Sequence, residues 1–183
     1  MRVRVATVAD AGEIARAHAE WRRGYLVGLV PSALGVAQPS LDSPAYWRGI
    51  LAEQRSPEVA VLLAEDDAGR LVGAAHGGPL RRHELRFDGE LDYDGELYDL
   101  FVVNLPGTEP ETKARRALVR GVAGHLRQIG RRSMLAWCLD GGLTCSAYLA
   151  MGGVRLDQVD VRDDFGLRYA PYGWPDIALL LEL

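Results

Sequence analysis

The hydrophobic pattern of the chain is clearest from residue 96 to residue 129, where an alternating stretch is followed by a helical one. Residues 96–103, ELYDLFVV, are rich in β-branched and aromatic side chains and predict a central β-strand. Strict alternation places Glu96, Tyr98, Leu100 and Val102 on one side of it. Residues 109–130 predict the longest helix, because apolar side chains recur there at helical spacing: Ala114, Ala117, Leu118, Val122, Leu126 and Ile129.

The loop between this strand and this helix contains Pro106 and Gly107. A strand that enters a helix through such a loop often binds an anion, because the first helical N–H groups have no partner within the helix. The loop is therefore the first candidate for a functional site.

Shorter patterns predict the remaining elements. Thr7 and Asp10 form a sequence close to a capping box, so a helix begins there, with Ile14, Ala17, His18, Trp21 and Tyr25 near one face. We also expect strands at 2–7 and 134–139, a hairpin of 59–65 and 70–76, short helices at 46–54 and 143–151, and final strands at 155–165 and 177–183. The Tyr/Pro/Gly/Trp segment between the last two strands predicts a loop.

Composition narrows the class of protein. The 183 residues show neither a repeat nor a linker, which predicts a single domain spanning 1–183. A net charge of −4 argues against a nucleic-acid partner, and no apolar run is long enough to cross a membrane. The N-terminus lacks the apolar core of a signal peptide. Cys138 and Cys145 are too few for a disulfide framework, so we expect a reduced, cytoplasmic protein.

Three stretches resemble the GNAT (Gcn5-related) N-acetyltransferases. ELYDLFVV followed by an Ala-Leu helix resembles their central strand and helix. HAEWRRGYLVGLVP resembles, with one residue shifted, the His-x-x-x-Trp-x-x-x-Tyr-x-Gly-Leu-x-Pro pattern of one branch of that family. WCLDGGLTCSAYLAMGGV aligns without gaps to the Trp-Val-Leu-Glu-x-Asn-x-x-Ala-x-x-Phe-Tyr-x-x-x-Gly-Phe pattern of the same branch. The resemblance implies an α/β fold with a mixed, mainly antiparallel sheet of six to seven strands, flanked by about four helices.

The resemblance also implies a reaction and a site. It implies transfer of an acetyl or other acyl group from acyl-CoA, with acetyl-CoA as the co-substrate, to the amine of a small molecule or peptide, and it is compatible with a homodimer. A base is expected on the central strand, among Glu96, Tyr98 and Asp99. Cofactor contacts are expected from Val102, Val103, Lys113, Ala114, Arg115 and Arg116, and acceptor contacts from Trp21, Tyr25 and Trp47.

The sequence departs from the family pattern at three places. The glycine-rich positions of the pyrophosphate loop, Gln/Arg-x-x-Gly-x-Gly/Ala in the family, fall on Pro110, Glu111, Lys113 and Arg115. Thr108 to Glu111 instead form a capping box, and two carboxylates stand at the positive end of the helix dipole. This predicts weak CoA binding, on the order of 1 mM. The family's Asn and Tyr near the late helix are replaced by Gly142 and Leu149, and Tyr148 is expected in the core.

Two hypotheses follow. The first is a GNAT-type N-acyltransferase with an altered pyrophosphate-binding loop. The second is a GNAT fold that has lost CoA chemistry and serves as a binding or assembly module. Histidines 18, 76, 83 and 125 have no metal-ligand spacing, so no metal site is expected.

Overall fold

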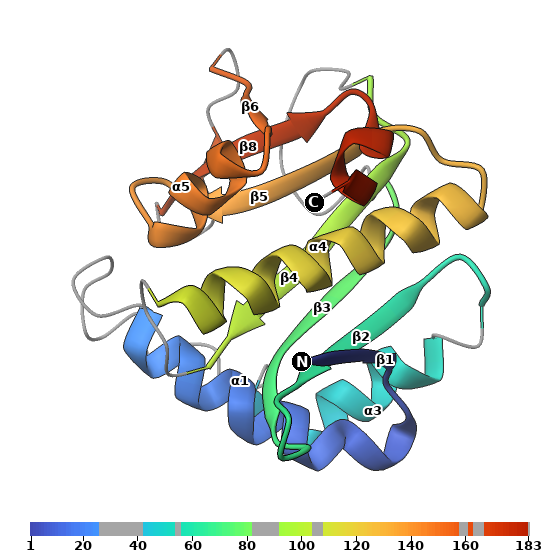
Figure 1. Cartoon of the computed structure of the whole chain (residues 1–183), viewed down its shortest axis with the longest axis vertical. Coiled ribbons are helices and arrows are strands. Elements are labelled where there is room, and N and C mark those ends of the chain that lie inside the picture. Colours follow the sequence, from blue (N-terminus) through green and yellow to red (C-terminus); the bar gives the residue numbers. More distant parts are fainter. Residues whose placement is uncertain are drawn as a thin grey trace.

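The structure, a computed structural model, describes residues 1–25, 42–53, 56–81, 92–103, 108–157, 161–162 and 167–182 (Figure 1). Its helices are α1 (Ala11–Tyr25), α3 (Pro44–Glu53), α4 (Glu109–Gln128) and α5 (Leu143–Ala150), with 3-10 helices η1 (Val8–Asp10) and η3 (Ile177–Glu182). Its strands are β1 (Arg2–Val5), β2 (Ala60–Glu65), β3 (Leu71–Pro79), β4 (Gly95–Val102), β5 (Met134–Leu139), β6 (Val154–Arg155), β7 (Val161–Arg162) and β8 (Arg168–Trp174). The predicted pyrophosphate loop, 104–107, lies outside the described residues, as does most of the predicted loop at 32–44.

The strands form a single sheet in the order β1-β2-β3-β4-β5-β8-β6, with β7 pairing β8. Only β4 and β5 pair in parallel, and every other pairing among the described residues is antiparallel. The predicted mixed, mainly antiparallel sheet is confirmed, with β4 at its centre.

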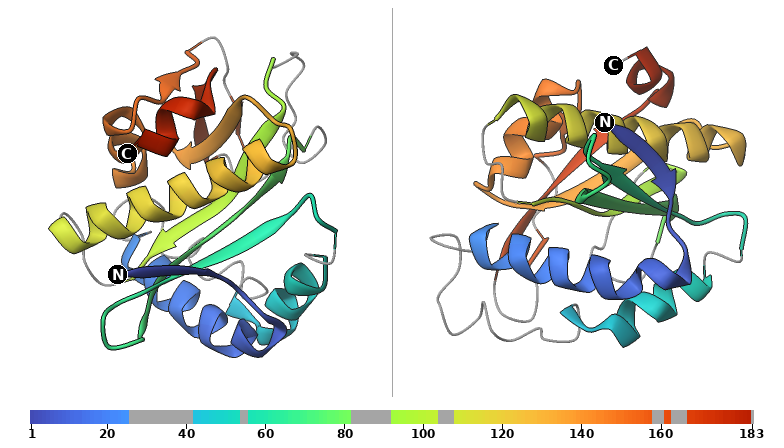
Figure 2. Two further views of the ribbon diagram at one scale, coloured as in Figure 1. Left: turned by 45° about the vertical axis from the view of Figure 1, so that its right-hand side comes forward. Right: turned by 60° about the horizontal axis from the view of Figure 1, so that its bottom comes forward.

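Helices cover both faces of the sheet. Figure 2 shows α4 and α5 on one face and α1 and α3 on the other. Each face has its own apolar cluster: Leu118 and Leu126 of α4 belong to one, and Ile14 of α1 and Trp47 of α3 belong to the other. The burial of two separate faces explains why β2 and β3 carry few polar side chains on either face.

The parallel pair at the centre separates soon after it forms. β4 and β5 pair only through Glu96 with Leu135 and Leu97 with Ala136, although the two strands have eight and six residues. Beyond these pairs, β4 continues along β3 and β5 continues along β8. The two central strands are therefore unpaired beyond Leu97 and Ala136, and we refer to this unpaired interval as the gap between β4 and β5.

A β-bulge in β4 corrects the predicted alternation. The register with β3 shifts between His76, which lies opposite Asp99, and Gly77, which lies opposite Leu97. A bulge adds one residue to a strand, so the side chains beyond it change face relative to strict alternation. Leu97, Leu100 and Val102 consequently face α4, whereas Phe101 packs with α1 and α3. Leu100 and Val102 thus do not share a face with Glu96 and Tyr98.

The C-terminal elements differ from the prediction. Residues 177–182 are a 3-10 helix rather than a strand, because Ile177 and Leu180 are buried one 3-10 turn apart, in the apolar cluster that also contains α4. The predicted loop is strand β8, whose residues Ala170–Trp174 are buried beside β5 and β6. Only two-residue strands, β6 and β7, form in the described parts of the predicted strand at 155–165.

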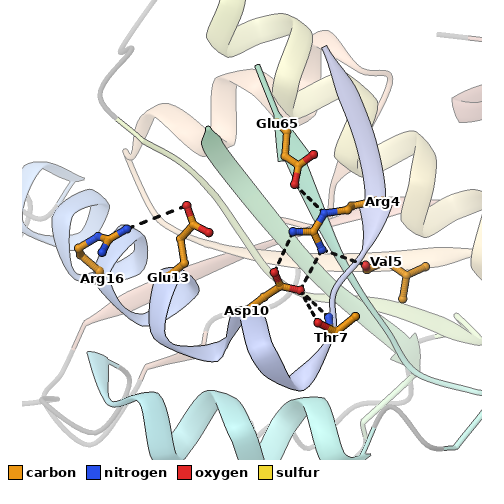
Figure 3. Close-up of polar contacts among 7 residues, drawn as sticks. All are labelled: Arg4, Val5, Thr7, Asp10, Glu13, Arg16 and Glu65. Atoms are coloured by element: carbon orange, nitrogen blue, oxygen red, sulfur yellow. Dashed lines mark hydrogen bonds and ion pairs between the residues drawn. The ribbon is translucent and has the colours of Figure 1, made fainter. Parts of the chain in front are cut away.

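The first strand is fastened to the first helix by ion pairs (Figure 3). Arg4 contacts Asp10 through both terminal nitrogens, at 2.8 and 2.9 Å, and contacts Glu65 of β2 at 2.6 Å. The backbone N–H of Thr7 donates to Asp10 at 2.7 Å, which confirms the predicted capping box. One arginine thus joins β1, β2 and the start of the helical segment.

Candidate functional site

Two of the three candidate bases on β4 are held by protein partners. Glu96 is 2% exposed, and its carboxylate accepts from the backbone N–H of Arg81 at 2.9 Å and from the Arg81 guanidinium at 3.0 Å. The Tyr98 hydroxyl donates to the carbonyl of Pro79, and the Arg81 guanidinium lies 3.9 Å above the Tyr98 ring. Both side chains therefore stabilise the beginning of β4 around Arg81.

Asp99 is placed differently. The bulge directs it toward α1, and 32% of its side chain remains exposed. Burial of the surrounding site raises the pKa of the Asp99 carboxyl above its ordinary value of 3.8, while the positive charge that His18 can carry acts in the opposite direction. A raised pKa makes a carboxylate a better proton acceptor, and its partly open position lets a substrate reach it.

His18 of α1 contacts Asp99 from within an aromatic cage. Its Nε2 atom lies 3.7 Å from Asp99 Oδ2, and its Nδ1 atom lies 3.3 Å from Asp42 Oδ1. The imidazole is 3% exposed, with ring centroids of Trp21, Trp47 and Phe101 at 5.4, 5.6 and 5.2 Å. Trp47 is itself 1% exposed and packs in the core, whereas Trp21 is only partly buried.

A second buried histidine borders the same face. His76 of β3 meets the Tyr98 ring edge-on at 4.8 Å, and its Nε2 atom has no hydrogen-bond partner among the described residues. Burial, helped by the nearby charge of Arg81, lowers the pKa of His76 to about 4. His76 is therefore neutral at physiological pH.

A pocket of about 180 Å³ lies on the opposite face of the sheet, between the first turns of α4 and helix α5. It is lined by Glu111, Thr112, Arg115, Arg116, Leu143, Ala147, Ala150 and Met151. Arg115 is only 6% exposed; one terminal nitrogen pairs with Glu111, and Nη1 has no hydrogen-bond partner within the described parts of the chain. A buried guanidinium with an unused donor is suited to bind an anion.

The expected cofactor residues separate into two groups. Arg115 and Arg116 line the pocket. Lys113 is exposed and does not line it, and Ala114 is fully buried against the sheet. Val102 is also in the core, and the next residue, Val103, donates its N–H to the carbonyl of Val72 at 2.9 Å. Of the six expected cofactor residues, only the two arginines therefore line the pocket.

Tyr25 at the end of α1 reaches the start of α5. Its ring stacks on Trp21 at 4.8 Å and 18°, and its hydroxyl lies 2.3 Å from where a Cβ on Gly142 would be. Burial raises the pKa of Tyr25, whereas a hydrogen bond with Thr144 and the charge of Arg115 act to lower it. Tyr25 thus lies near residues of both faces of the sheet, Trp21 on one side and Thr144 and Arg115 on the other.

Comparisons with known proteins agree with this architecture. No protein-family model matches the chain. The uncharacterized N-acetyltransferase YuaI of Bacillus subtilis (strain 168) is 28% identical over 187 residues, covering 99% of this chain and 96% of the relative. The PaiA N-acetyltransferase of Thermoplasma acidophilum, solved in complex with coenzyme A, superposes with a TM-score of 0.71 at 11% identity, covering 94% of this chain and 98% of that one. A GNAT superfamily phosphinothricin acetyltransferase of Sinorhizobium meliloti, solved with acetyl-CoA, gives a TM-score of 0.65 at 16% identity, covering 96% and 88%.

The chain has the fold of the GNAT acetyltransferases, and its sequence is similar to that of one N-acetyltransferase over nearly its whole length. Its departures from the GNAT pattern on α5 have a structural counterpart. Gly142 stands where the pattern has Asn, and the space that a side chain would need there is filled by the hydroxyl of Tyr25. Leu149 stands where the pattern has Tyr and is 55% exposed, while Tyr148 is 2% exposed and packs on Tyr172 and Trp174, as expected of a core residue.

The two cysteines of the chain form a disulfide, contrary to the expectation of a reduced pair. Cys138 at the end of β5 and Cys145 on α5 are bonded, with their Cα atoms 5.9 Å apart. Their spacing of seven residues brings them together because a turn folds α5 back onto β5. Two cysteines are too few for a disulfide framework, but they suffice for a single bridge between neighbouring elements, which the sequence analysis did not predict.

Sequence reasoning also missed His18, Asp42 and Thr144 as neighbours of the site. The spacing 18, 21, 25 on α1 was a usable signal, because these positions share one helical face. Elsewhere, none of the helices in the described ranges is long and apolar enough to cross a membrane. Within the same ranges, no three His, Cys, Asp or Glu side chains cluster in a way that could hold a metal ion.

Proposed function

We propose that this protein is an N-acetyltransferase that moves the acetyl group of acetyl-CoA to the amine of a small molecule or peptide. The observation that carries the proposal is the position of Asp99, a partly exposed carboxylate with a raised pKa, at the gap between β4 and β5. The pocket with the unused Arg115 donor lies on the other face of the same sheet. The CoA complexes of the Thermoplasma and Sinorhizobium proteins support the choice of donor.

The donor is proposed to bind on the side of α4 and α5. Arg115 and Arg116 replace the missing glycine cradle by binding phosphate oxygens with their side chains, which are strong, geometrically suited partners for phosphate. The Glu111 carboxylate pairs with one terminal nitrogen of the Arg115 guanidinium, so it competes with a phosphate ligand for that guanidinium. A pocket of about 180 Å³ accommodates only part of acetyl-CoA, and we assign it to the phosphate-bearing part.

The acceptor amine is proposed to approach from the side of α1 and α3. Asp99 removes a proton from the amine, whose nitrogen attacks the thioester carbonyl carbon. A C–N bond forms, the C–S bond breaks, and the CoA thiolate leaves. Tyr25, whose pKa burial raises, stays protonated at neutral pH and donates its phenolic proton to that thiolate. Because a base and an acid flank one gap, we prefer this function to that of a non-catalytic module.

The test is steady-state acetyl transfer to a panel of amines by the parent protein and by Asp99→Asn. We expect the substitution to lower kcat by roughly 100- to 10,000-fold, the range for loss of a general base. The KM for acetyl-CoA is expected to change less than about twofold, because the base acts in the chemical step.

Glu96→Gln and Asp92→Asn complete the experiment. Glu96 is the other strand-borne carboxylate, and Asp92 is an exposed acid just before β4 that serves as a control. A folded Asp99→Asn protein with parental kcat would remove Asp99 from the reaction, and an equal loss confined to Glu96→Gln would assign the base to Glu96.

A further inference from the structure

His18 lies between two carboxylates from different elements. Asp99 belongs to β4, and Asp42 precedes α3, so residues 18, 42 and 99 meet only in the folded chain. A histidine that serves only as a packed core residue needs a partner for its N–H group, and Asp42 alone would satisfy that need. The second carboxylate, at the other ring nitrogen, calls for a separate explanation.

The hydrogen-bond partners assign the tautomer. An ionised carboxylate only accepts hydrogen bonds, so Nδ1 carries the proton that it donates to Asp42 Oδ1 at 3.3 Å. Nε2 then has a free lone pair, which lies 3.7 Å from Asp99 Oδ2. This separation is longer than a hydrogen bond, and catalytic contacts commonly shorten to bonding distance once substrate is bound.

We propose that His18 is a proton-relay and positioning residue for Asp99, an inference that rests on the acetyltransferase function proposed above. Asp99 takes a proton from the acceptor amine and passes it to His18 Nε2, which restores the Asp99 carboxylate. The imidazolium formed in this way is flanked by Asp99 and Asp42. After the products leave, the proton on Nε2 returns to solvent through Asp99, whose side chain is 32% exposed, while Nδ1 keeps its proton on Asp42, so the starting tautomer is restored for the next turnover.

The surroundings favour this route over direct loss of the proton to water. Trp21, Trp47 and Phe101 enclose the imidazole and leave it 3% exposed, so protons reach it through its two nitrogens. The charged groups that face the relay are Arg22 on α1, which pairs with Asp42, and Arg81 after β3, which acts on Asp99.

The experiment compares His18→Gln with the parent protein in acetyl transfer across a pH series. Glutamine keeps a polar group between the carboxylates but cannot pass a proton. We expect kcat to fall at least roughly tenfold, while the KM for acetyl-CoA stays within about twofold. The pH profile of kcat/KM should also change, because glutamine replaces a side chain that can accept a proton from Asp99.

Two further variants keep the test decisive. Asp42→Asn leaves the imidazole in place but removes the carboxylate that keeps the proton on Nδ1, so it should also lower kcat, which keeps the relay testable if His18→Gln does not fold. His125→Gln is the matched control. His125 lies on α4, on the other face of the sheet from His18, and its Nε2 atom contacts the carbonyl oxygen of Glu58.

The outcomes separate this inference from the proposed function. If the parent and the folded His18→Gln protein share the same kcat and pH profile while Asp99→Asn is inactive, His18 is a core residue and only the relay is overturned. If the parent transfers no acetyl group to any amine and does not bind acetyl-CoA, the proposed function fails and the relay with it.

Discussion

The environment of each side chain, more than its type, separates the roles of Glu96 and Asp99. Both are carboxylates of β4, three positions apart, yet Arg81 holds Glu96 in a buried ion pair while Asp99 stays partly open. The same holds on α4, where Arg115 is buried and its neighbour Arg116 is exposed. The sequence predicted cofactor contacts from this whole basic run, because it could not show which of its members is buried and which is exposed.

The Arg4–Asp10 pair makes a testable contribution to stability. The Arg4 guanidinium holds the pKa of Asp10 well below its usual value of 3.8. A carboxyl whose pKa is lower in the folded state stabilises the fold above the unfolded pKa and loses that contribution as the pH falls through the folded pKa. Asp10→Asn should therefore cost roughly 1–3 kcal/mol at pH 7 and progressively less below about pH 4.

Urea unfolding at pH 7, 5 and 3 measures this effect. Glu13→Gln is the control, since Glu13 is 44% exposed and lies 4.0 Å from Arg16 (Figure 3). It should change the free energy of unfolding by less than about 0.5 kcal/mol. Equal stability of Asp10→Asn and the parent at pH 7 would show that the network of Figure 3 contributes nothing.

At the scale of elements, α1 and β4 together supply the residues of the proposed acceptor site. His18, Trp21 and Tyr25 share one face of α1, which the helical spacing predicted. The bulge in β4 turns Asp99 toward this face, and strict alternation could not predict it, because a bulge depends on the register with β3.

The C-terminal elements show a second limit of sequence reasoning. The segment 177–182, IALLLE, is apolar enough for a strand, yet it forms a 3-10 helix because the chain packs there against α4. Pro171 suggested a loop but lies within β8, where its carbonyl accepts from the N–H of Leu156 at 3.1 Å just beyond the short strand β6. Proline is tolerated in a sheet at such a point because its missing N–H is not needed by a neighbouring strand.

The disulfide between β5 and α5 makes a prediction for the pocket. Helix α5 has only eight residues, and the Cys138–Cys145 bond fastens it to the sheet at the wall of the pocket. Reduction, or Cys145→Ser, should lower stability by roughly 2 kcal/mol, the loop-closure contribution for so short a loop. It should also weaken acetyl-CoA binding, because α5 is then held less firmly.

Alkylation of the denatured protein, followed by mass spectrometry, shows directly whether the two cysteines are bonded to each other or are free thiols. Without reductant, neither thiol should react, and after reduction both should react. Two labelled cysteines in the unreduced protein would show that the disulfide does not form.

At the scale of the whole molecule, the two parts of the proposed site lie on opposite faces of one sheet: Asp99 and His18 on one face, and the pocket with Arg115 on the other. The order of elements and the central strand and helix were predictable, because each has its own local periodicity. The site was only partly predictable: β4 was identified, but Asp42 and His18 reach Asp99 only through the packing of α1 and α3 on the sheet. Contacts among residues that are distant in sequence leave no local pattern.

Calorimetric titration with acetyl-CoA tests the central claim, that this fold binds the donor through Arg115. We predict saturable one-to-one binding with a Kd below about 1 mM, because the buried guanidinium offers an attraction that the sequence did not reveal. Arg115→Gln should weaken binding roughly tenfold or more, Glu111→Gln should tighten it by freeing Arg115, and Arg127→Gln at the far end of α4 should leave it unchanged. Absence of saturable binding by the parent, or equal affinity of the parent and Arg115→Gln, would contradict the account.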